Sequence, residues 1–428
     1  MRVLMFGWEF PPHISGGLGT ACYGLTKGLM KHGAQVHFVV PKAYGDEDQQ
    51  AVRILNASEI PVDFTQENIR DYQENLKYLE VDALLVPYMD PESYVVEKEK
   101  IEQRKKKEKK NVVSAKYEFS GKYGPNLLEE VARYAMVGGQ IAQEVDFDVI
   151  HAHDWLTYHA GIAAKRATGK PLVAHMHATE FDRSGENVNQ IVYDIERTGM
   201  QEADLVIAVS HFTRNLVIER YGIDPNKVIT VHNAVEPTDA KPVEDQERYI
   251  KEKVVTFLGR ITYQKGPEYF VEAANLILQR DPDVRFVMAG SGDLLEKMIK
   301  RIAQLGMGTR FHFTGFLRGD MIDHLFAMTD VFVMPSVSEP FGIVPLEAMR
   351  SNVPVVISKQ SGVSEVLRHA LKVDFWDIEG LADDIYGLLH YKALSQTFVK
   401  YGKDEVDNLK WENAAAKVMQ VYRQATGR

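Results

Sequence analysis

The sequence has almost no cysteine and no long apolar run. Cys22 is the one cysteine among 428 residues, so neither an intrachain disulfide nor a cluster of thiolate ligands can form. No apolar stretch approaches the ~18 residues that a bilayer-spanning helix needs. The N-terminal segment, MRVLMFGWEF, is interrupted by Gly7 and Glu9 and lacks the apolar segment of a signal peptide. We therefore expect a cytoplasmic protein without a membrane span.

An excess of basic residues is also missing. The chain has 60 acidic residues against 50 lysines and arginines, which gives a formal net charge of −10 at pH 7. This balance argues against nucleic acid or an anionic membrane surface as the principal partner, although it leaves room for a basic pocket that binds a phosphorylated ligand. With 45% apolar and 26% charged residues, the composition is that of a globular protein, and the length predicts two domains.

One stretch in the second half, at 331–349, combines several features of a ligand site. Its sequence, VFVMPSVSEPFGIVPLEAM, predicts a short buried strand, a loop broken by prolines and serines, and the start of a helix. Glu339 lies in the loop and Glu347 in the helix, with seven residues between them. Carboxylates accept hydrogen bonds from adjacent sugar hydroxyls, and the N–H groups of a helix N-terminus attract phosphate. The spacing alone is more typical of two acids that face water.

The first half opens with a β-loop-α-β unit, which is typical of a doubly wound parallel sheet. Strands are predicted at 2–7 and 34–40, with a helix from about residue 20 to 32 between them. The loop before the helix has the sequence GGLG, which lets the backbone approach a ligand closely because glycine has no Cβ. Its spacing does not match the dinucleotide-binding fingerprint, so a simple tight turn is the alternative. The residues concerned are Gly17, Leu18 and Gly19.

The second half contains a basic loop between a predicted strand and a predicted helix. After the strand at 254–258, the sequence GRITYQKG places Arg260 and Lys265 five residues apart. Arginine supplies a planar fork of donors and lysine a compact charge, so this pair suits a pyrophosphate. Isolated basic residues are more often solvated surface. A further glycine turn, which includes Gly290, follows the strand predicted at 284–289.

Histidines gather at the ends of two predicted strands of the first half. The strand at 148–151 ends in HAHDW, which contains Asp154, and the strand at 172–174 ends in HMHATEF, which contains His177. Residues two apart on a strand face one side, an arrangement that metal-dependent hydrolases use for paired ligands. A hydrolase barrel would need eight strand–helix units, whereas this chain has the pattern of two doubly wound halves. We therefore expect no metal, and some of these histidines are interpreted as core residues.

The motif S-x-x-E-P-F-G-x-x-x-L-E-A-M, at 336–349, resembles the donor-sugar signature of retaining nucleotide-sugar transferases with the GT-B architecture. These are glycosyltransferase family 4 and its glycogen-synthase relatives, which GGLG and the histidine segments also resemble. The resemblance implies an α/β fold with two Rossmann-like doubly wound domains and an interdomain cleft. It divides the chain into an N-terminal acceptor-side domain at 1–237 with a charged insertion at about 92–125, a C-terminal nucleotide-sugar-binding domain at 238–410, and a last helix at 411–428 that crosses back to the N-terminal domain.

The same resemblance implies roles for the donor side of the site. Glu339 holds hydroxyls of the donor sugar, and Glu347 holds the ribose. Arg260, Lys265 and the amides of the glycine loop stabilise negative charge on the leaving β-phosphate without a metal. The remaining donor-binding residues that the resemblance implies are Phe341, Gly342, Gly290, Gly17, Leu18 and Gly19.

On the acceptor side, the resemblance places His177 against the sugar near the reaction centre, with Asp154 close by. The expected reaction moves glucose from ADP- or UDP-glucose, a substrate and not a cofactor, to an α-glucan with retention at the anomeric carbon. Alternatives in the same architecture are a transferase for a small-molecule or lipid acceptor, a sucrose- or trehalose-forming transferase, and a nucleotide-sugar epimerase. A metal-dependent hydrolase and a non-catalytic regulator are alternatives from other classes. The chain departs from the family pattern at Ala234 and Val363, where glycine is usual.

Overall fold

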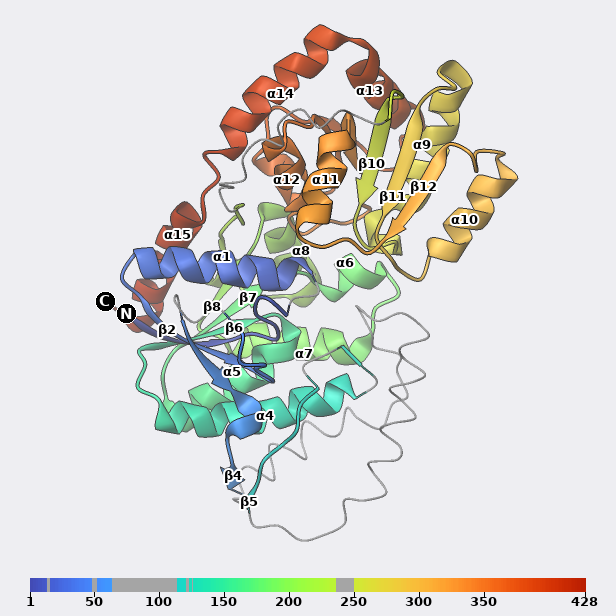
Figure 1. Ribbon diagram of the computed structural model, residues 1–428. Coiled ribbons are helices and arrows are strands. Elements are labelled where there is room, and N and C mark those ends of the chain that lie inside the picture. The colour runs from blue at the N-terminus through green and yellow to red at the C-terminus, as the bar shows by residue number, and fades with distance from the viewer. Residues whose placement is uncertain (14–15, 48–51, 64–113, 121–122, 125, 236–249) are drawn as a thin grey trace, which may run out of the picture.

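The structure is a computed structural model that describes residues 1–13, 16–47, 52–63, 114–120, 123–124, 126–235 and 250–428. These residues form two parallel β-sheets flanked by helices, and one short antiparallel pair of strands (Figure 1). The expected α/β fold with two Rossmann-like halves is confirmed. Most of the charged insertion expected at about 92–125, and the boundary expected after residue 237, lie outside the described residues.

The first sheet is parallel throughout, in the strand order β3-β2-β1-β6-β7-β8-β9. Its central strands are runs of apolar residues with nearly every side chain buried, as expected where helices cover both faces. The strand order reverses between β1 and β6, and ligands bind at this switch point in doubly wound sheets. The strands are β1 (Arg2–Phe6), β2 (Gln35–Val40), β3 (Arg53–Asn56), β6 (Val149–His153), β7 (Leu172–Met176), β8 (Leu205–Ala208) and β9 (Val228–Thr230), and the antiparallel pair is β4 (Val62–Asp63) with β5 (Ser114–Ala115).

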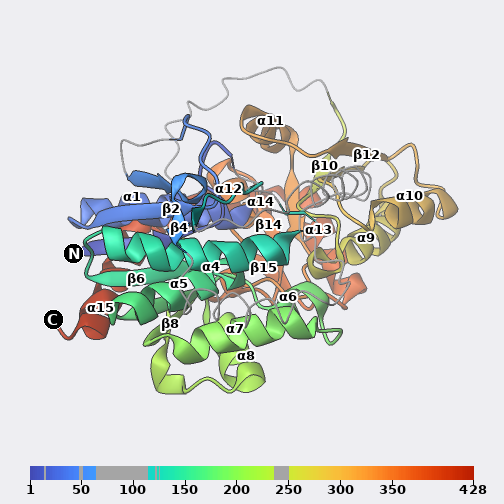
Figure 2. The same ribbon diagram turned by 90° about the horizontal axis from the view of Figure 1, so that it is seen from below.

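Helices cover both faces of the first sheet, as Figures 1 and 2 show. Successive side chains of β1 point to opposite faces of the sheet. Val3 and Met5 pack in the core on one face. Leu4 and Phe6 pack on the other side. The first face carries α1 (Gly17–Lys31) and α15 (Trp411–Thr426). The second carries α4 (Leu127–Glu144), α5 (Trp155–Thr168), α7 (Gln190–Glu202) and α8 (His211–Tyr221), and α6 (Glu180–Ser184) lies toward the second half.

The second sheet repeats this design in the order β12-β11-β10-β13-β14-β15, again all parallel. The order reverses between β10 and β13, so the loops after these two strands lie at the switch point of the second sheet. The strands are β10 (Val254–Leu258), β11 (Arg285–Ala289), β12 (Phe311–Gly315), β13 (Val331–Met334), β14 (Val355–Ser358) and β15 (Leu371–Val373). The helices are α9 (Pro267–Arg280), α10 (Leu295–Gln304), α11 (Asp320–Met328), α12 (Val344–Arg350), α13 (Ile378–His390) and α14 (Lys392–Val406).

The chain returns to the first half at its end, where α14 leads to α15 beside α1 (Figure 1). Glycines on α1 permit this close packing. A Cβ at Gly24 would lie 2.2 Å from Trp411 Nε1, and one at Gly28 would lie 2.7 Å from the Trp411 carbonyl oxygen. The hydroxyl of Tyr422 in α15 lies 2.6 Å from His151 Nδ1 in β6. Over the described ranges, no helix combines the length and apolarity needed to cross a membrane.

Candidate active site

The loop at 335–343, hereafter the acid loop, follows β13 and carries Glu339 at the carboxyl edge of the second sheet. Glu339 is only 6% exposed, and its carboxylate accepts a hydrogen bond from Ser336 Oγ at 3.1 Å. Gly342 has a φ of +99°, and a Cβ there would lie 3.1 Å from Glu339 Cγ. Glycine therefore suits this turn both by its positive φ and by its small size.

Lys265 of the neighbouring loop forms an ion pair with Glu339. This basic loop, at 259–266, follows β10 and ends in the short helical turn η3 (Tyr263–Lys265). Gly266 has a φ of +62°, and a Cβ there would lie 2.1 Å from the Pro335 carbonyl oxygen. Only glycine lets the two loops approach this closely. The basic and acid loops therefore form one unit in which the cation lies against the acid.

Arg260 and Gln264 continue the basic loop. The Arg260 guanidinium donates to Gln264 Oε1 at 2.7 Å, and the backbone N–H of Val337 donates to the Gln264 carbonyl oxygen at 2.9 Å. Gly290 supports this turn from β11, because a Cβ there would lie 1.9 Å from the Gly259 carbonyl oxygen. The glycine turn after β11 thus positions the backbone next to Arg260.

Two further expected donor residues, Phe341 of the acid loop and Glu347 of α12 (Val344–Arg350), have different surroundings. Phe341 is buried in the core between the halves, so only its backbone remains available to a donor. Glu347 lies in the first turn of α12. Burial raises the pKa of Glu347, an effect that the nearby Arg350 guanidinium opposes and the Asp323 carboxylate reinforces.

Asp154 directly follows β6 and has a φ of +59°, a left-handed conformation that is rare for residues other than glycine. Its Oδ1 accepts hydrogen bonds from the backbone N–H groups of His177 at 2.6 Å and Ala178 at 3.4 Å. Burial raises the pKa of Asp154 to about 6, although the Arg183 guanidinium and these two N–H groups act in the opposite direction. Backbone strain and a raised pKa in one residue are both frequent at functional sites.

His177 begins the turn at 177–179 that follows β7, hereafter the His177 turn. Its Nε2 lies 2.9 Å from His153 Nδ1. Burial lowers the pKa of His177 to about 3, so the ring is neutral near pH 7. It can therefore donate or accept a hydrogen bond but cannot contribute a positive charge.

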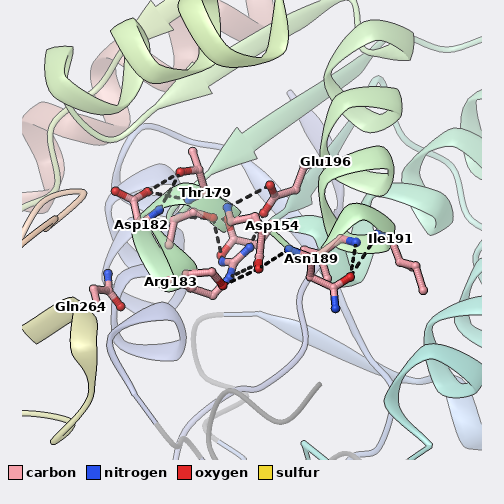
Figure 3. A network of polar contacts seen from close by, with 12 residues as sticks. Asp154, Thr179, Asp182, Arg183, Asn189, Ile191, Glu196 and Gln264 are labelled. Carbon is pink, nitrogen blue, oxygen red and sulfur yellow. Dashed lines mark hydrogen bonds and ion pairs between the residues drawn. The ribbon is translucent and has the colours of Figure 1, made fainter. Parts of the chain in front are cut away.

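A buried ionic network supports the His177 turn (Figure 3). Arg183 of α6 lies at its centre, where it forms ion pairs with Glu180 and Glu196 and donates to the Ala178 carbonyl oxygen at 2.9 Å. Burial raises the pKa of Glu196 to about 7, against the opposing effect of Arg183. The network therefore ties the backbone of the turn to α6 and α7.

Asp182 joins this network to the second half. Its Oδ2 accepts hydrogen bonds from the backbone N–H and the hydroxyl of Thr179, each at 2.7 Å. Its own backbone N–H donates to Thr179 Oγ1 at 3.2 Å, which completes the capping box of α6. Its Oδ1 accepts a hydrogen bond from Ser338 Oγ of the acid loop. Gln264 of the basic loop is drawn near the same network in Figure 3, and η3 contacts α6. The acid and basic loops thus lie against α6, the helix that follows the His177 turn.

A second set of contacts between the halves surrounds the start of α8. Ser210, the N-cap of α8, donates to the Pro340 carbonyl oxygen at 2.6 Å. A Cβ at Gly362 would lie only 2.4 Å from Ser210 Cβ. Glu365 accepts hydrogen bonds from two backbone N–H groups in the first turn of α8, at 2.9 and 2.6 Å, and forms an ion pair with His232. The acid loop therefore contacts the first half on both of its sides.

The glycine segment differs from the expected loop. Gly17, Leu18 and Gly19 form the first turn of α1, so the helix begins three residues earlier than expected. The N–H groups of a first turn need no partner inside the helix, and the Gly19 N–H donates to Glu9 Oε1 at 3.2 Å. Packing of the nearly buried Leu18 also stabilises this turn. The expected backbone donors are therefore those of a helix N-terminus.

Lys265 and Glu339 are thus in direct contact, as are Asp154 and His177, and the hydrogen bond from Ser338 to Asp182 links the two pairs. Sequence reasoning missed Glu9, Asp182 and Ser338. Glu9 is a buried acid that interrupts an apolar run, and this pattern in the sequence could have indicated a residue with a specific role. Asp182 and Ser338 are ordinary polar residues in loop sequences, and nothing local to either residue indicates the partner.

Two family models match consecutive parts of the chain. Residues 241–405 match glycosyl transferases group 1, and residues 100–239 match glycosyltransferase family 4. An alpha-maltose-1-phosphate synthase of Mycolicibacterium smegmatis is 32% identical over 310 residues, which cover 65% of this chain and 79% of that protein. The chain belongs to glycosyltransferase family 4, group 1. The metal-dependent hydrolase alternative is therefore dropped.

Other relatives of this family 4 glycosyltransferase align over nearly the whole chain. An uncharacterized glycosyltransferase of Methanocaldococcus jannaschii is 28% identical over 442 residues, covering 99% of this chain and 98% of that protein. A glycogen synthase of Mycobacterium tuberculosis is 24% identical over 440 residues, covering 99% and 94%. These relatives support the coarse activity, a nucleotide-sugar-dependent glycosyl transfer.

Solved structures share the GT-B fold with this family 4 glycosyltransferase. A sucrose-phosphate synthase from Thermosynechococcus elongatus superposes with a TM-score of 0.72 at 18% identity, covering 99% of this chain and 98% of that one. Anabaena HepE, solved in complex with UDP-glucose, superposes with a TM-score of 0.68 at 19% identity, covering 99% and 100%. At these identities the likeness shows the fold alone.

Proposed function

We propose that this family 4 glycosyltransferase is a retaining glucosyltransferase that moves glucose from ADP- or UDP-glucose to a hydroxyl of an α-glucan. The observation that carries the proposal is the ion pair of Lys265 with Glu339 in a loop whose Ser338 hydrogen-bonds to Asp182, the capping-box partner of Thr179 in the His177 turn. An acid that can bind sugar hydroxyls and a cation that can bind phosphate are thus in contact, and one hydrogen bond ties their loop to the helix that follows the neutral His177.

On the donor side, Lys265 and Arg260 bind the pyrophosphate, and Glu339 binds hydroxyls of the glucose. The Lys265 ammonium pairs with Glu339, and on donor binding it turns from this acid toward the phosphate. The N-terminus of α1 faces the diphosphate with the N–H groups of its first turn, where the helix dipole favours an anion. Glu347 in the first turn of α12 binds the ribose.

The reaction breaks the bond between the anomeric carbon and the β-phosphate oxygen, and the electron pair stays on that oxygen. The acceptor hydroxyl attacks from the same face, and its proton passes to the leaving phosphate. No protein nucleophile is needed. Lys265 and Arg260 stabilise the developing phosphate charge, and His177, which is neutral near pH 7 because burial lowers its pKa, hydrogen-bonds the sugar without adding charge beside the forming oxocarbenium.

The choice of acceptor rests on the relatives. Two of them are named as a glycogen synthase and an alpha-maltose-1-phosphate synthase, and both names describe the joining of glucose units. The second name favours a second candidate acceptor, because building maltose 1-phosphate from a glucose donor requires glucose 1-phosphate. The polymer and the sugar phosphate are therefore the two acceptors to compare.

The test is a transfer assay with four combinations of substrates. ADP-glucose and UDP-glucose, each labelled in the glucose, are incubated with glycogen or with glucose 1-phosphate. We expect label in the polymer with one of the two donors, and glucoamylase should release it as glucose. The Glu339→Gln variant, which keeps the shape of the side chain, should lose most of this transfer.

Three outcomes distinguish the alternatives. Label found in maltose 1-phosphate and not in glycogen would replace the polymer by the small acceptor. Donor hydrolysis without transfer to either acceptor would overturn both acceptor assignments. Inversion at the anomeric carbon of the first product, followed by NMR, would overturn the retaining mechanism.

A further inference from the structure

The strand ends below the His177 turn hold a compact block of histidines. His151 and His153 come from β6, and His175 and His177 come from β7 and the residue after it, with His153 opposite His175 in the strand register. Two cross-strand hydrogen bonds join them, from His151 Nε2 to His175 Nδ1 at 3.2 Å and from His153 Nδ1 to His177 Nε2 at 2.9 Å. The rings of His175 and His177 stack with their centroids 4.2 Å apart. The proposed transfer reaction uses only His177.

Two ring nitrogens of these histidines are buried without a hydrogen-bond partner in the part of the chain that the structure describes. Among the residues that the structure describes, His153 Nε2 and His175 Nε2 have no hydrogen-bond partner. The side chains are fully buried or nearly so, at 0% and 2% exposure. Buried polar atoms are almost always paired, and unpaired ones call for an explanation such as a bound ion. A neutral imidazole nitrogen with a free lone pair is the form that binds a metal.

The thiol of Cys22 completes the cluster from α1. Its sulfur and one nitrogen each of His153 and His177 lie within 4.8 Å of one another, and so do one nitrogen each of His151, His153 and His175. Around a tetrahedral zinc ion, bond lengths of about 2.0–2.3 Å place ligand atoms roughly 3.3–3.8 Å apart. Small movements of side chains would therefore bring the ligands to bonding distance.

The charges around Cys22 suit a cation. The carboxylates of Asp154 and Glu9 act electrostatically on the Cys22 side chain. The same two carboxylates would offset the charge of a bound dication. A set of one thiolate and imidazoles selects zinc and similar borderline ions over magnesium or calcium.

We propose that Cys22, His153 and His177 form a binding site for a zinc-like divalent ion in the first half. Binding converts the thiol to a thiolate, and the thiol proton leaves to solvent. His177 is partly exposed and gives the ion its route in. The fourth position of the ion stays open to water. The ion is no reactant in the transfer, which runs without it.

An inhibitory effect follows for the enzyme, and this consequence rests on the proposed function. The ion occupies His177, which the transfer mechanism places against the sugar. We therefore expect zinc to reduce transfer activity in proportion to the fraction of protein that holds it. Metal binding itself does not depend on the proposed function.

The test uses cobalt as a spectroscopic substitute for zinc in the full chain. The protein is freed of metal with a chelator and titrated with Co²⁺. Because Cys22 is the one cysteine in the sequence, a sulfur-to-cobalt charge-transfer band can arise only from this site. We expect such a band at about one equivalent of Co²⁺ and its loss when Zn²⁺ is added. Cobalt binding without the band, or no binding by the folded wild-type protein, would overturn the proposal.

Variants assign the ligands. Cys22→Ser and His153→Gln should each abolish the band, while circular dichroism confirms that they fold. The matched control is His211→Gln, because His211 belongs to a separate exposed cluster with His232 and Glu365, and the band should persist there. A band that survives in His153→Gln would overturn the ligand assignment. If zinc binds at Cys22 without reducing transfer, the site stands and the role of His177 in the proposed reaction is wrong.

Discussion

Ser338 donates a hydrogen bond to Asp182 across the two halves of the protein. Ser338 directly precedes Glu339, the acid proposed to hold the donor sugar, and Asp182 caps the helix that follows the His177 turn. One hydrogen bond therefore connects the loop proposed to bind the donor to the helix that follows the segment proposed to face the reaction centre. We infer that this bond helps to hold the two segments in place relative to one another.

Replacing Ser338 with alanine should weaken this connection. The change removes the donor to a buried carboxylate, so we expect the free energy of unfolding to fall by about 1–3 kcal/mol. We also expect kcat/KM for the donor to fall severalfold, because the acid loop loses the hydrogen bond that holds it in position against α6. Urea denaturation and steady-state kinetics measure the two effects. Ser395→Ala on α14, far from the contact in sequence, is the control, and unchanged kinetics in Ser338→Ala would contradict this role of the bond.

Replacing Lys265 with alanine should reduce activity more strongly than the Ser338→Ala change, and the effect should fall on kcat. The proposed loss is one cationic partner of the leaving phosphate, which corresponds to about 10²–10³ in kcat. Calorimetric titration with UDP and ADP should show weaker binding as well. Lys297→Ala is the matched control, because Lys297 forms an ion pair with Glu268 on the exposed surface of the same half. Equal nucleotide affinity in Lys265→Ala and wild type would remove Lys265 from the donor site.

The sheets could be predicted from the sequence because parallel strands with two covered faces are short apolar runs between loops, as at β1 and β13. The start of α1 could not, since the glycines at 16–19 predict a loop. The first turn tolerates Gly17 and Gly19 because its N–H groups have no helical partner to lose, and Glu9 binds one of them. A propensity rule for helix interiors fails at a helix end.

The candidate site also contains some contacts that the sequence predicts and others that it does not. Lys265 and Glu339 could be expected to meet because both follow strands at the switch point of one sheet, where topology brings the loops together. The hydrogen bond from Ser338 to Asp182 spans 156 residues of sequence and depends on how one half docks on the other, which no local pattern encodes. The side chain of Phe341 packs in the core with Val209 of the first half, a neighbour that no local pattern indicates.

The buried acid Glu196 should make stability depend on pH in a defined direction. Burial raises its pKa from 4.5 to about 7, so in this window the folded state binds a proton that the unfolded state has released. Its contribution to stability is therefore greatest at low pH and is lost as pH rises through about 7. Glu196→Gln should cost more unfolding free energy at pH 5 than at pH 8.5, as urea titrations at both pH values can show. Glu186→Gln, at an exposed ion pair with Arg220, is the control; an equal cost at both pH values for Glu196→Gln would contradict the raised pKa.

Gly362 offers a test of the second contact between the halves. A Cβ at this position would lie 2.2 Å from the Pro340 carbonyl oxygen and 2.4 Å from Ser210 Cβ, distances at which backbone on one side must move. Overpacking of this kind costs about 1–3 kcal/mol, so Gly362→Ala should lower the midpoint of thermal unfolding. It should also lower kcat/KM, because Pro340 adjoins Glu339 in the acid loop. Gly308→Ala is the matched control, since a Cβ there meets nothing within 4 Å and should change stability by less than about 0.5 kcal/mol. If both alanine variants unfold and turn over like wild type, the two halves are not in contact at Gly362 in the working enzyme.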